Sequence, residues 1–121
     1  MASVELRGLT KRFGPVAVVD DVSLKIEHGM LVCLFGPSGC GKTTTLRLIA
    51  GFIEPSAGEI LVGGRVVSSR QRTVPPERRN MSMIFQSYAL WPHMTVAENV
   101  VYGLRLRNVE NDAIRRRIVL R

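Results

Sequence analysis

Residues 31–50 read LVCLFGPSGCGKTTTLRLIA, and this stretch predicts the fold of the chain around it. Five apolar residues at 31–35 come first, which is typical of a short strand buried on both faces of a sheet. Residues 36–43 then have the spacing G-x-x-x-x-G-K-T, and Leu46, Ile49 and Ala50 follow at helical spacing. Gly51 is placed to end that helix. The stretch therefore predicts a strand, a glycine-rich loop and a helix in direct succession.

A loop of this spacing between a strand and a helix is a phosphate-binding motif. Its glycines let the backbone approach a phosphate chain and turn N–H groups inward, because a Cβ would obstruct both. The helix that follows points its positive end at the same place. We expect Lys42 to reach the β- and γ-phosphates of a nucleotide and Thr43 to offer its hydroxyl to Mg²⁺. The alternative is a glycine-rich turn that matches by chance, and the flanking strand and helix patterns argue against it.

The composition limits the classes of protein to which the chain can belong. It has 121 residues, 45% of them hydrophobic, which indicates one small globular domain with a modest core. The formal net charge is +7, which suggests nucleic acid or an anionic membrane as a partner. Because no aromatic residues are interleaved with the arginines, we favour a solvated basic face. The charge is concentrated in two groups, Arg70, Arg72, Arg78 and Arg79, and Arg115, Arg116, Arg117 and Arg121.

The two cysteines and the apolar runs bear on the cellular compartment. Cys33 and Cys40 match neither a metal-ligand spacing nor a disulfide framework, and Cys33 is most simply a small core residue. The first residues, MASVELRGLTKRF, lack the apolar centre of a signal peptide. No apolar run approaches the ~20 residues that a membrane-spanning helix requires. We therefore expect a cytosolic chain, at most peripheral to a membrane.

The remaining patterns predict further elements. Strands are expected at 3–9 and 22–26 with a loop at 10–15, and a hairpin at 59–62 and 65–67 with its turn at Gly63 and Gly64. A surface loop at 68–79 and a short strand at 81–85 follow. Thr95 and Glu98 fit a capping box, with Val96, Val100 and Leu104 on one helical face. Asn111 or Asp112 is expected to cap a last helix that carries Ile114 and Ile118.

Two quoted segments carry a resemblance to a known family. GPSGCGKTTTLRLIAG at 36–51, followed by PPERRNMSMIFQSYALWPHMTVAENVVYGL at 75–104, resembles the nucleotide-binding subunit of ATP-binding cassette (ABC) transporters. The closest resemblance is to bacterial importers of the maltose, glycerol-phosphate, ferric-iron and polyamine type, and it covers Val4 to about Leu106. It implies an α/β fold, namely an incomplete P-loop NTPase (RecA-like) core with an antiparallel β subdomain formed by residues 3–26 and 59–67.

The resemblance also implies roles for individual residues. Phe13 matches the aromatic residue that stacks on adenine, although it is alternatively a turn residue packing on the sheet. Gln86 matches the glutamine that senses Mg²⁺ and the attacking water, and the alternative is a surface amide. The segment from Tyr88 to Thr95 matches the surface that receives a helix of the membrane subunit, and the alternative is a core aromatic cluster. The phosphate loop that would bind the nucleotide comprises Gly36, Pro37, Ser38, Gly39, Cys40, Gly41, Lys42, Thr43 and Thr44.

Departures from the family pattern qualify the expected function. The printed sequence contains no LSGGQ-like signature, no apolar strand ending in Asp-Glu and no switch histidine, and His93 is no substitute for the last of these. The resemblance therefore identifies residues 1–121 as the N-terminal part of a nucleotide-binding domain, ending before the signature and Walker B motifs. Whether the chain is itself an ATPase stays open, and alone we expect it to bind Mg-ATP at most.

The implied whole function is that of the ATP-binding subunit of an import system, which couples ATP binding and hydrolysis to solute uptake. Its cofactors would be ATP and Mg²⁺. Its partners would be a membrane-spanning permease and a second nucleotide-binding subunit, with no nucleic acid expected. It would lie in the cytoplasm, peripheral on the inner face of the membrane. The alternatives are a soluble ABC protein that acts on nucleic acid or ribosomes, and a nonfunctional truncated remnant.

Overall fold

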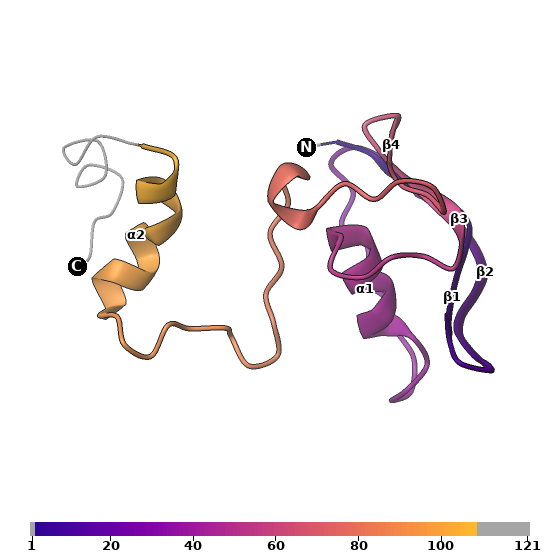
Figure 1. Cartoon of the computed structure of the whole chain (residues 1–121), viewed down its shortest axis with the longest axis horizontal. Coiled ribbons are helices and arrows are strands. Elements are labelled where there is room, and N and C mark those ends of the chain that lie inside the picture. Colours follow the sequence, from indigo (N-terminus) through magenta and orange to yellow (C-terminus); the bar gives the residue numbers. More distant parts are fainter. Residues whose placement is uncertain (1, 109–121) are drawn as a thin grey trace. The chain divides into compact units, whose positions relative to one another are not determined.

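A computed structural model describes residues 2–108 of the chain, which divide into two compact units (Figure 1). The first unit ends at Met83 and the second begins at Ile84. The helix expected after Asn111 or Asp112 lies outside the described residues.

The first unit contains a four-stranded antiparallel sheet with the strand order β2-β1-β3-β4 (Figure 1). The strands are β1 (Val4–Phe13), β2 (Val16–Ile26), β3 (Ala57–Val62) and β4 (Arg65–Ser68). The predicted hairpin and antiparallel subdomain are confirmed, and Gly63 and Gly64 turn with φ of 57° and 76°, as a two-residue hairpin turn requires. The expected loop at 10–15 is wrong in extent, because pairing of Phe13 with Val16 continues the ladder almost to the turn.

Helix α1 (Lys42–Ala50) packs on this sheet and completes a small core. The core consists of the buried residues Leu6, Leu9, Val19, Leu48 and Ile60. Burying an aliphatic side chain contributes about 1.5–3 kcal/mol, so these contacts fix α1 against β1, β2 and β3. The predicted helix end is confirmed, because Gly51 has a φ of 86° and the N–H of Phe52 donates to the carbonyl of Arg47 at 2.9 Å. That pattern is a Schellman motif.

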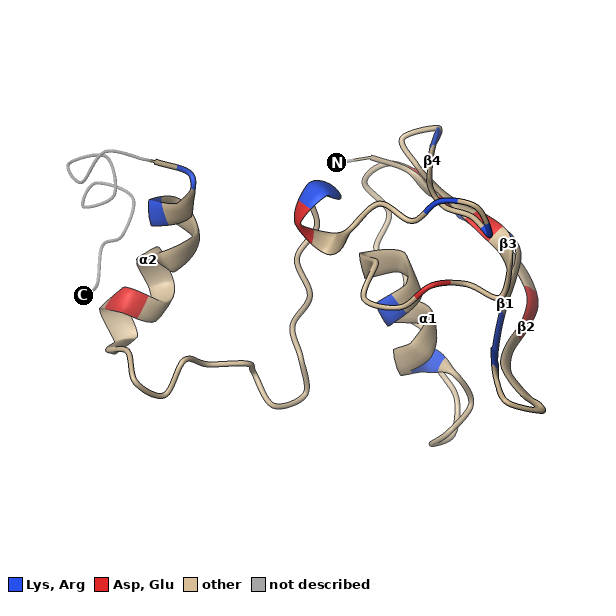
Figure 2. Cartoon of the chain, viewed as in Figure 1, with Lys and Arg blue, Asp and Glu red and all other residues tan. Residues whose placement is uncertain are grey.

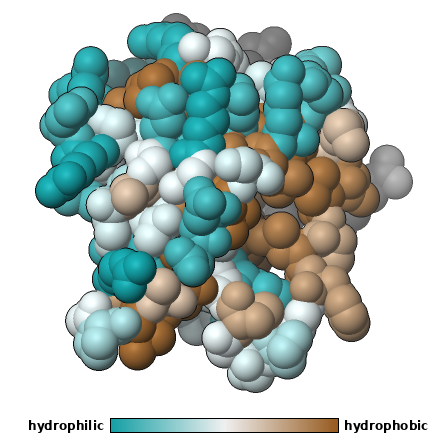
Figure 3. Space-filling view, turned by 90° about the vertical axis from the view of Figure 1, so that its right-hand side faces the viewer, coloured by the Kyte–Doolittle hydropathy of each residue, from teal (hydrophilic) through white to brown (hydrophobic). Residues whose placement is uncertain are grey.

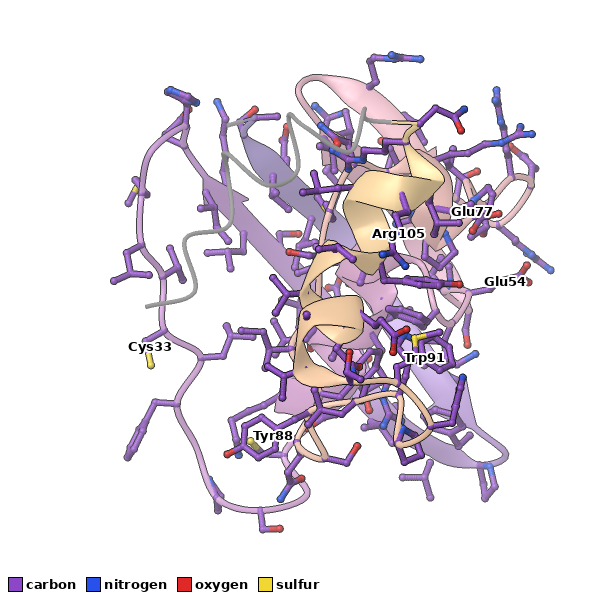
Figure 4. The ribbon with its side chains drawn as sticks, turned by 90° about the vertical axis from the view of Figure 1, so that its left-hand side faces the viewer. Cys33, Glu54, Glu77, Tyr88, Trp91 and Arg105 are labelled. Carbon is purple, nitrogen blue, oxygen red and sulfur yellow. The ribbon has the colours of Figure 1, made fainter. Side chains whose placement is uncertain are left out.

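The strands expected at 31–35 and 81–85 are absent from the structure, which corrects both predictions. Leu31 and Phe35 are 99% and 98% exposed, and Cys33, expected in the core, is exposed as well. Figure 4 shows the Cys33 side chain pointing away from the neighbouring elements. The physical reason is the lack of a partner: no strand among residues 2–108 pairs with 31–35, and an apolar strand of this kind forms only between neighbours that satisfy its N–H and C=O groups.

Arg79 corrects the expectation of a wholly exposed loop at 68–79. Figure 2 shows basic segments around β4 and the short 3₁₀ helix η1 (Pro76–Arg78), and Arg78 is indeed exposed. Arg79 is only 5% exposed, and Ser68 is fully buried. All five guanidinium N–H groups have oxygen acceptors, at the carbonyls of Leu48, Ile49, Val67 and Val74 and the hydroxyl of Ser68. Arg79 thus ties the end of α1 to β4.

The second unit is built around helix α2 (Val96–Leu106). The predicted capping box is confirmed: the N–H of Glu98 donates to the Thr95 hydroxyl at 3.2 Å, and the N–H of Thr95 donates to the Glu98 carboxylate at 2.7 Å. Val101 is the buried residue of this helix, whereas Val96 and Val100 are exposed. No helix among residues 2–108 has both the length and the apolarity needed to cross a bilayer.

Candidate phosphate-binding site

The loop before α1 turns tightly enough to place its backbone against the sheet. The N–H of Cys40 donates to the carbonyl of Pro37 at 3.4 Å, and Gly39 and Gly41 have φ of 78° and 92°. Only glycine adopts such angles without strain. A Cβ on Gly41 would lie 2.5 Å from the carbonyl oxygen of Val18 on β2, whereas a Cβ on Gly39 would meet open space. Gly41 is therefore required by packing, and Gly39 by conformation alone.

Lys42 folds its amine back over this loop. Its Nζ donates to the carbonyls of Gly36 and Pro37, both at 2.6 Å, and lies 3.4 Å from Sγ of Cys40. The carbonyls are neutral acceptors, and a negatively charged phosphate oxygen adds ionic attraction to its hydrogen bond with an ammonium group, which makes that bond stronger. The amine is thus held at the loop, with bonds that an incoming phosphate can replace.

The start of α1 is suited to an anion. The first N–H groups of any helix lack intrahelical acceptors, and no side chain caps α1 at Gly41. No acidic residue lies in the first turn, so nothing there competes with a bound anion for the positive end of the helix. The Thr45 hydroxyl donates to the Gly41 carbonyl at 2.8 Å and is buried, while Thr43 is exposed and Thr44 half-buried.

A hollow of about 380 Å³ lies behind the loop. Apolar side chains of β1, β2 and the 31–35 segment supply most of its lining, and Cys40, Lys42 and Thr45 complete it. The apolar part of the lining does not suit a triphosphate, whereas Cys40 and Lys42 form the edge that the hollow shares with the phosphate loop. Figure 3 shows apolar residues gathered toward the right of the face that it draws. The exposed large apolar residues of the 30–35 segment are Met30, Leu31, Val32 and Phe35.

Phe13 lies at the end of β1, beside the turn into β2. Its side chain is 51% exposed, so part of the ring is open to a ligand. The Nζ of Lys11 lies 5.3 Å from the ring centroid, within the range of a cation–π contact. The sequence singled out Phe13 but not Lys11.

Gln86 and the segment that follows it belong to the second unit. Gln86 is exposed and begins a turn in which Tyr88 and Ala89 have φ of 61° and 47°. Left-handed backbone is uncommon for residues other than glycine and concentrates at functional sites. Gln86 thus lies in the second unit, at the start of an exposed turn that has left-handed backbone at Tyr88 and Ala89.

The segment from Tyr88 to Thr95 exposes several apolar side chains. Tyr88, Leu90 and Trp91 are exposed, and Met94 is half-buried. The ring of Trp91 lies 5.6 Å from Tyr102 and 6.1 Å from His93, measured between centroids. Figure 4 shows Trp91 beside α2, and Tyr88 at the other end of the segment. The aromatic contacts are local, and they leave much of the apolar surface open.

Asn99 holds this segment to α2, and sequence reasoning missed it. Its Oδ1 accepts from the N–H of Trp91 at 2.8 Å, and its Nδ2 donates to the carbonyls of Trp91, Met94 and Thr95 at 3.2, 3.3 and 2.9 Å. One amide thereby fixes both ends of residues 91–95. The available signal was an asparagine directly after a capping box, where its side chain can reach the preceding loop.

Residues 2–108 contain no group of three or more His, Cys, Asp or Glu side chains placed to hold a metal ion. Mg²⁺ can bind through one or two protein oxygens when phosphate oxygens and water complete its octahedron. The exposed Thr43 hydroxyl fits such a partial role at the start of α1.

Fold and loop together define a class, an α/β protein with part of a P-loop NTPase core. A nucleotide-free ATP-binding cassette from an ABC transporter has a similar solved structure, with a TM-score of 0.54, 26% identity, and coverage of 56% of this chain and 27% of that one. The family model described as ABC transporter matches residues 19–120. The chain therefore belongs to the ABC transporter family.

Curated relatives narrow the resemblance to importers, as the sequence predicted. A spermidine/putrescine import ATP-binding protein of Rubrobacter xylanophilus is 53% identical over 96% of this chain and 30% of its own length. A trehalose/maltose import ATP-binding protein of Thermococcus litoralis is 48% identical over 98% of this chain and 32% of its own. An Fe(3+) ions import ATP-binding protein of Escherichia coli O157:H7 is 49% identical over 95% of this chain and 32% of its own length. The chain thus spans about a third of the length of these relatives.

Proposed function

We propose that this chain binds the triphosphate of ATP at the loop of residues 36–44 and contributes that site to the ATP-binding subunit of an import system. The observation that carries the proposal is the position of Lys42, whose amine lies on the carbonyls of Gly36 and Pro37 beside an uncapped helix start. Cation, N–H groups and helix dipole converge there, which is the chemistry that a triphosphate requires.

Each remaining residue of the proposed site has a role. Gly36, Pro37, Ser38, Gly39, Cys40 and Gly41 supply the backbone that faces the phosphates. Thr43 donates an oxygen to Mg²⁺, and Thr44 lies one residue further along the helix. Phe13 offers its exposed ring to adenine. Gln86, from the second unit, is proposed as a second oxygen ligand of the metal and as the group that orients the attacking water during hydrolysis in the whole subunit. The metal, when bound, neutralises charge on the phosphate oxygens.

The partner surface is proposed on the second unit. Tyr88, Leu90 and Trp91 are exposed apolar side chains on a segment that Asn99 holds in one conformation. Exposed apolar groups on a rigid segment are typical of a protein interface. The names of the relatives describe import proteins, so we assign this surface to a membrane permease on the inner face of the cell membrane.

A second nucleotide-binding subunit is the other expected partner. The burial of Arg79 removes one arginine from the basic face, which weakens the nucleic-acid alternative.

The test is an ATP titration of three proteins by isothermal calorimetry: the parent chain, Lys42→Ala and Lys25→Ala. Lys25 is an exposed lysine paired with Glu27 at 2.9 Å and serves as the matched control. Removing Lys42 leaves phosphate charge unpaired, a loss of roughly 2–5 kcal/mol, or about 30-fold or more in affinity. Lys25→Ala should bind like the parent. Equal affinities for the parent and Lys42→Ala would refute the assignment of the loop.

A further inference from the structure

We propose that Lys11 is a nucleobase-recognition residue, which holds the Phe13 ring from one face so that a base stacks on the other. The inference rests on the proposed nucleotide binding and adds a residue to it. It concerns the base of the ligand, whereas the loop of residues 36–44 concerns the phosphates.

The Nζ of Lys11 lies 5.3 Å from the centroid of the Phe13 ring. No carboxylate among residues 2–108 forms an ion pair with Lys11, so the ring is the partner that the structure gives its ammonium group. Phe13 remains 51% exposed. An aromatic ring that is half exposed and has a cation over one face is unlike a core phenylalanine, which is buried among apolar neighbours.

The loop touches β2 at Val18, because a Cβ on Gly41 would meet the Val18 carbonyl oxygen. Phe13 pairs with Val16, two residues from Val18 along β2, which corresponds to about 7 Å. Figure 1 shows the β1–β2 turn at the same end of the first unit as the start of α1. The ring is therefore separated from the loop by a span that a ribose can bridge.

A cation over the ring limits the rotation of the Phe13 side chain before a ligand arrives. A ring that is already oriented loses less conformational freedom when a base stacks on it. The orientation of the Phe13 ring favours only a ligand with a base, so Lys11 should not change the affinity of a ligand that has phosphates and no base. A simple charge effect of Lys11 would act on both kinds of ligand.

The experiment measures the affinities of ATP and of inorganic tripolyphosphate for the parent chain and three variants. Lys11→Met removes the cation and keeps an unbranched apolar side chain, Lys11→Arg restores a cation that stacks on aromatic rings, and Arg12→Met removes the neighbouring exposed arginine as a matched control. We expect Lys11→Met to weaken ATP binding roughly two- to five-fold, as for an exposed cation–π contact. Tripolyphosphate binding should stay unchanged, and Lys11→Arg should bind ATP like the parent.

Two results would overturn the inference while leaving the phosphate site intact. One is an unchanged ATP affinity in Lys11→Met. The other is an equal loss for ATP and tripolyphosphate, particularly if Arg12→Met shows it too, since Lys11 would then act only through its charge. If the parent chain binds neither ligand, the proposed function itself fails, and the inference fails with it. In a Phe13→Leu background, Lys11→Met should cause no further loss of ATP affinity.

Discussion

Replacing Arg79 with methionine should unfold the first unit at markedly lower denaturant concentrations. The guanidinium is 5% exposed and donates to five oxygens, at distances from 2.6 Å for the Ser68 hydroxyl to 3.2 Å for the Leu48 carbonyl. Burial lowers the pKa of Arg79 from its ordinary value, because the charged form loses hydration. It nevertheless remains charged at neutral pH, so five charge-assisted bonds are lost in the variant.

The expected loss in the free energy of unfolding of Arg79→Met is the balance of two opposing contributions. Hydrogen bonds to charged groups contribute about 1.5–3 kcal/mol each, but the desolvation of a buried cation costs several kcal/mol and offsets much of this. Methionine fills part of the volume and leaves acceptors of α1, β4 and the following loop unpaired. A net loss of about 3–5 kcal/mol is typical when one partner of a buried charged network is removed. That loss is a large share of the 5–15 kcal/mol that usually stabilises a domain.

The assay is urea unfolding followed by far-ultraviolet circular dichroism, with Arg78→Met as the matched control. Arg78 is exposed, so the same change there should alter the free energy of unfolding by no more than about 0.5 kcal/mol. Gly51→Ala provides a double-mutant cycle, because a Cβ on Gly51 would clash with the Arg79 guanidinium. Gly51→Ala should lower the free energy of unfolding less in the Arg79→Met variant than in the parent chain. A loss below 1 kcal/mol in Arg79→Met, or additive effects in the cycle, would refute the reasoning.

Three further predictions concern other parts of the chain. We expect the parent chain to self-associate through the exposed apolar side chains of Leu31 and Phe35, and the double variant Leu31→Lys, Phe35→Lys to associate less in analytical ultracentrifugation. Equal sedimentation of the two proteins would contradict this expectation. Hydrogen bonds from the Thr95 N–H and hydroxyl lower the pKa of Glu98 in the folded protein. The stabilisation that Glu98 gives to the α2 cap is therefore complete above its ordinary pKa of 4.5, and it is lost as the pH falls through the lower pKa of the folded state. Fluorescence of Trp91, the single tryptophan, should follow that loss, and a Glu98→Gln variant that changes equally with pH would contradict it. Mg-ATP should slow alkylation of Cys40 but not of Cys33, and mass spectrometry showing equal protection or none would contradict the placement of Cys40 in the site.

Local signals in the sequence predicted the elements that depend on local interactions. The Thr95–Glu98 capping box, the Gly63–Gly64 turn and the helix end at Gly51 each involve residues a few positions apart, and the structure confirms all three. Their geometry is set by backbone angles and nearby hydrogen bonds, which residue type reveals directly.

Elements that depend on distant partners were predicted poorly. The apolar run at 31–35 has the pattern of a buried strand, but no described strand pairs with it and it stays exposed. Arg79 resembled its exposed neighbours in sequence, and its burial depends on carbonyls of α1 and β4 that only the fold brings together. Asn99 and Lys11 were missed for the same reason, since their significance lies in contacts rather than in a motif.

The most direct test of the phosphate site is a ¹H–¹⁵N NMR titration of the ¹⁵N-labelled chain with inorganic tripolyphosphate, followed by ATP. We expect tripolyphosphate to shift the amide resonances of Gly39, Gly41, Lys42 and Thr43, and ATP to shift in addition those around Phe13. Lys42→Ala should abolish the shifts at matched ligand concentration. Shifts confined to other residues, or equal shifts in Lys42→Ala, would contradict the assignment of residues 36–44 as the phosphate site.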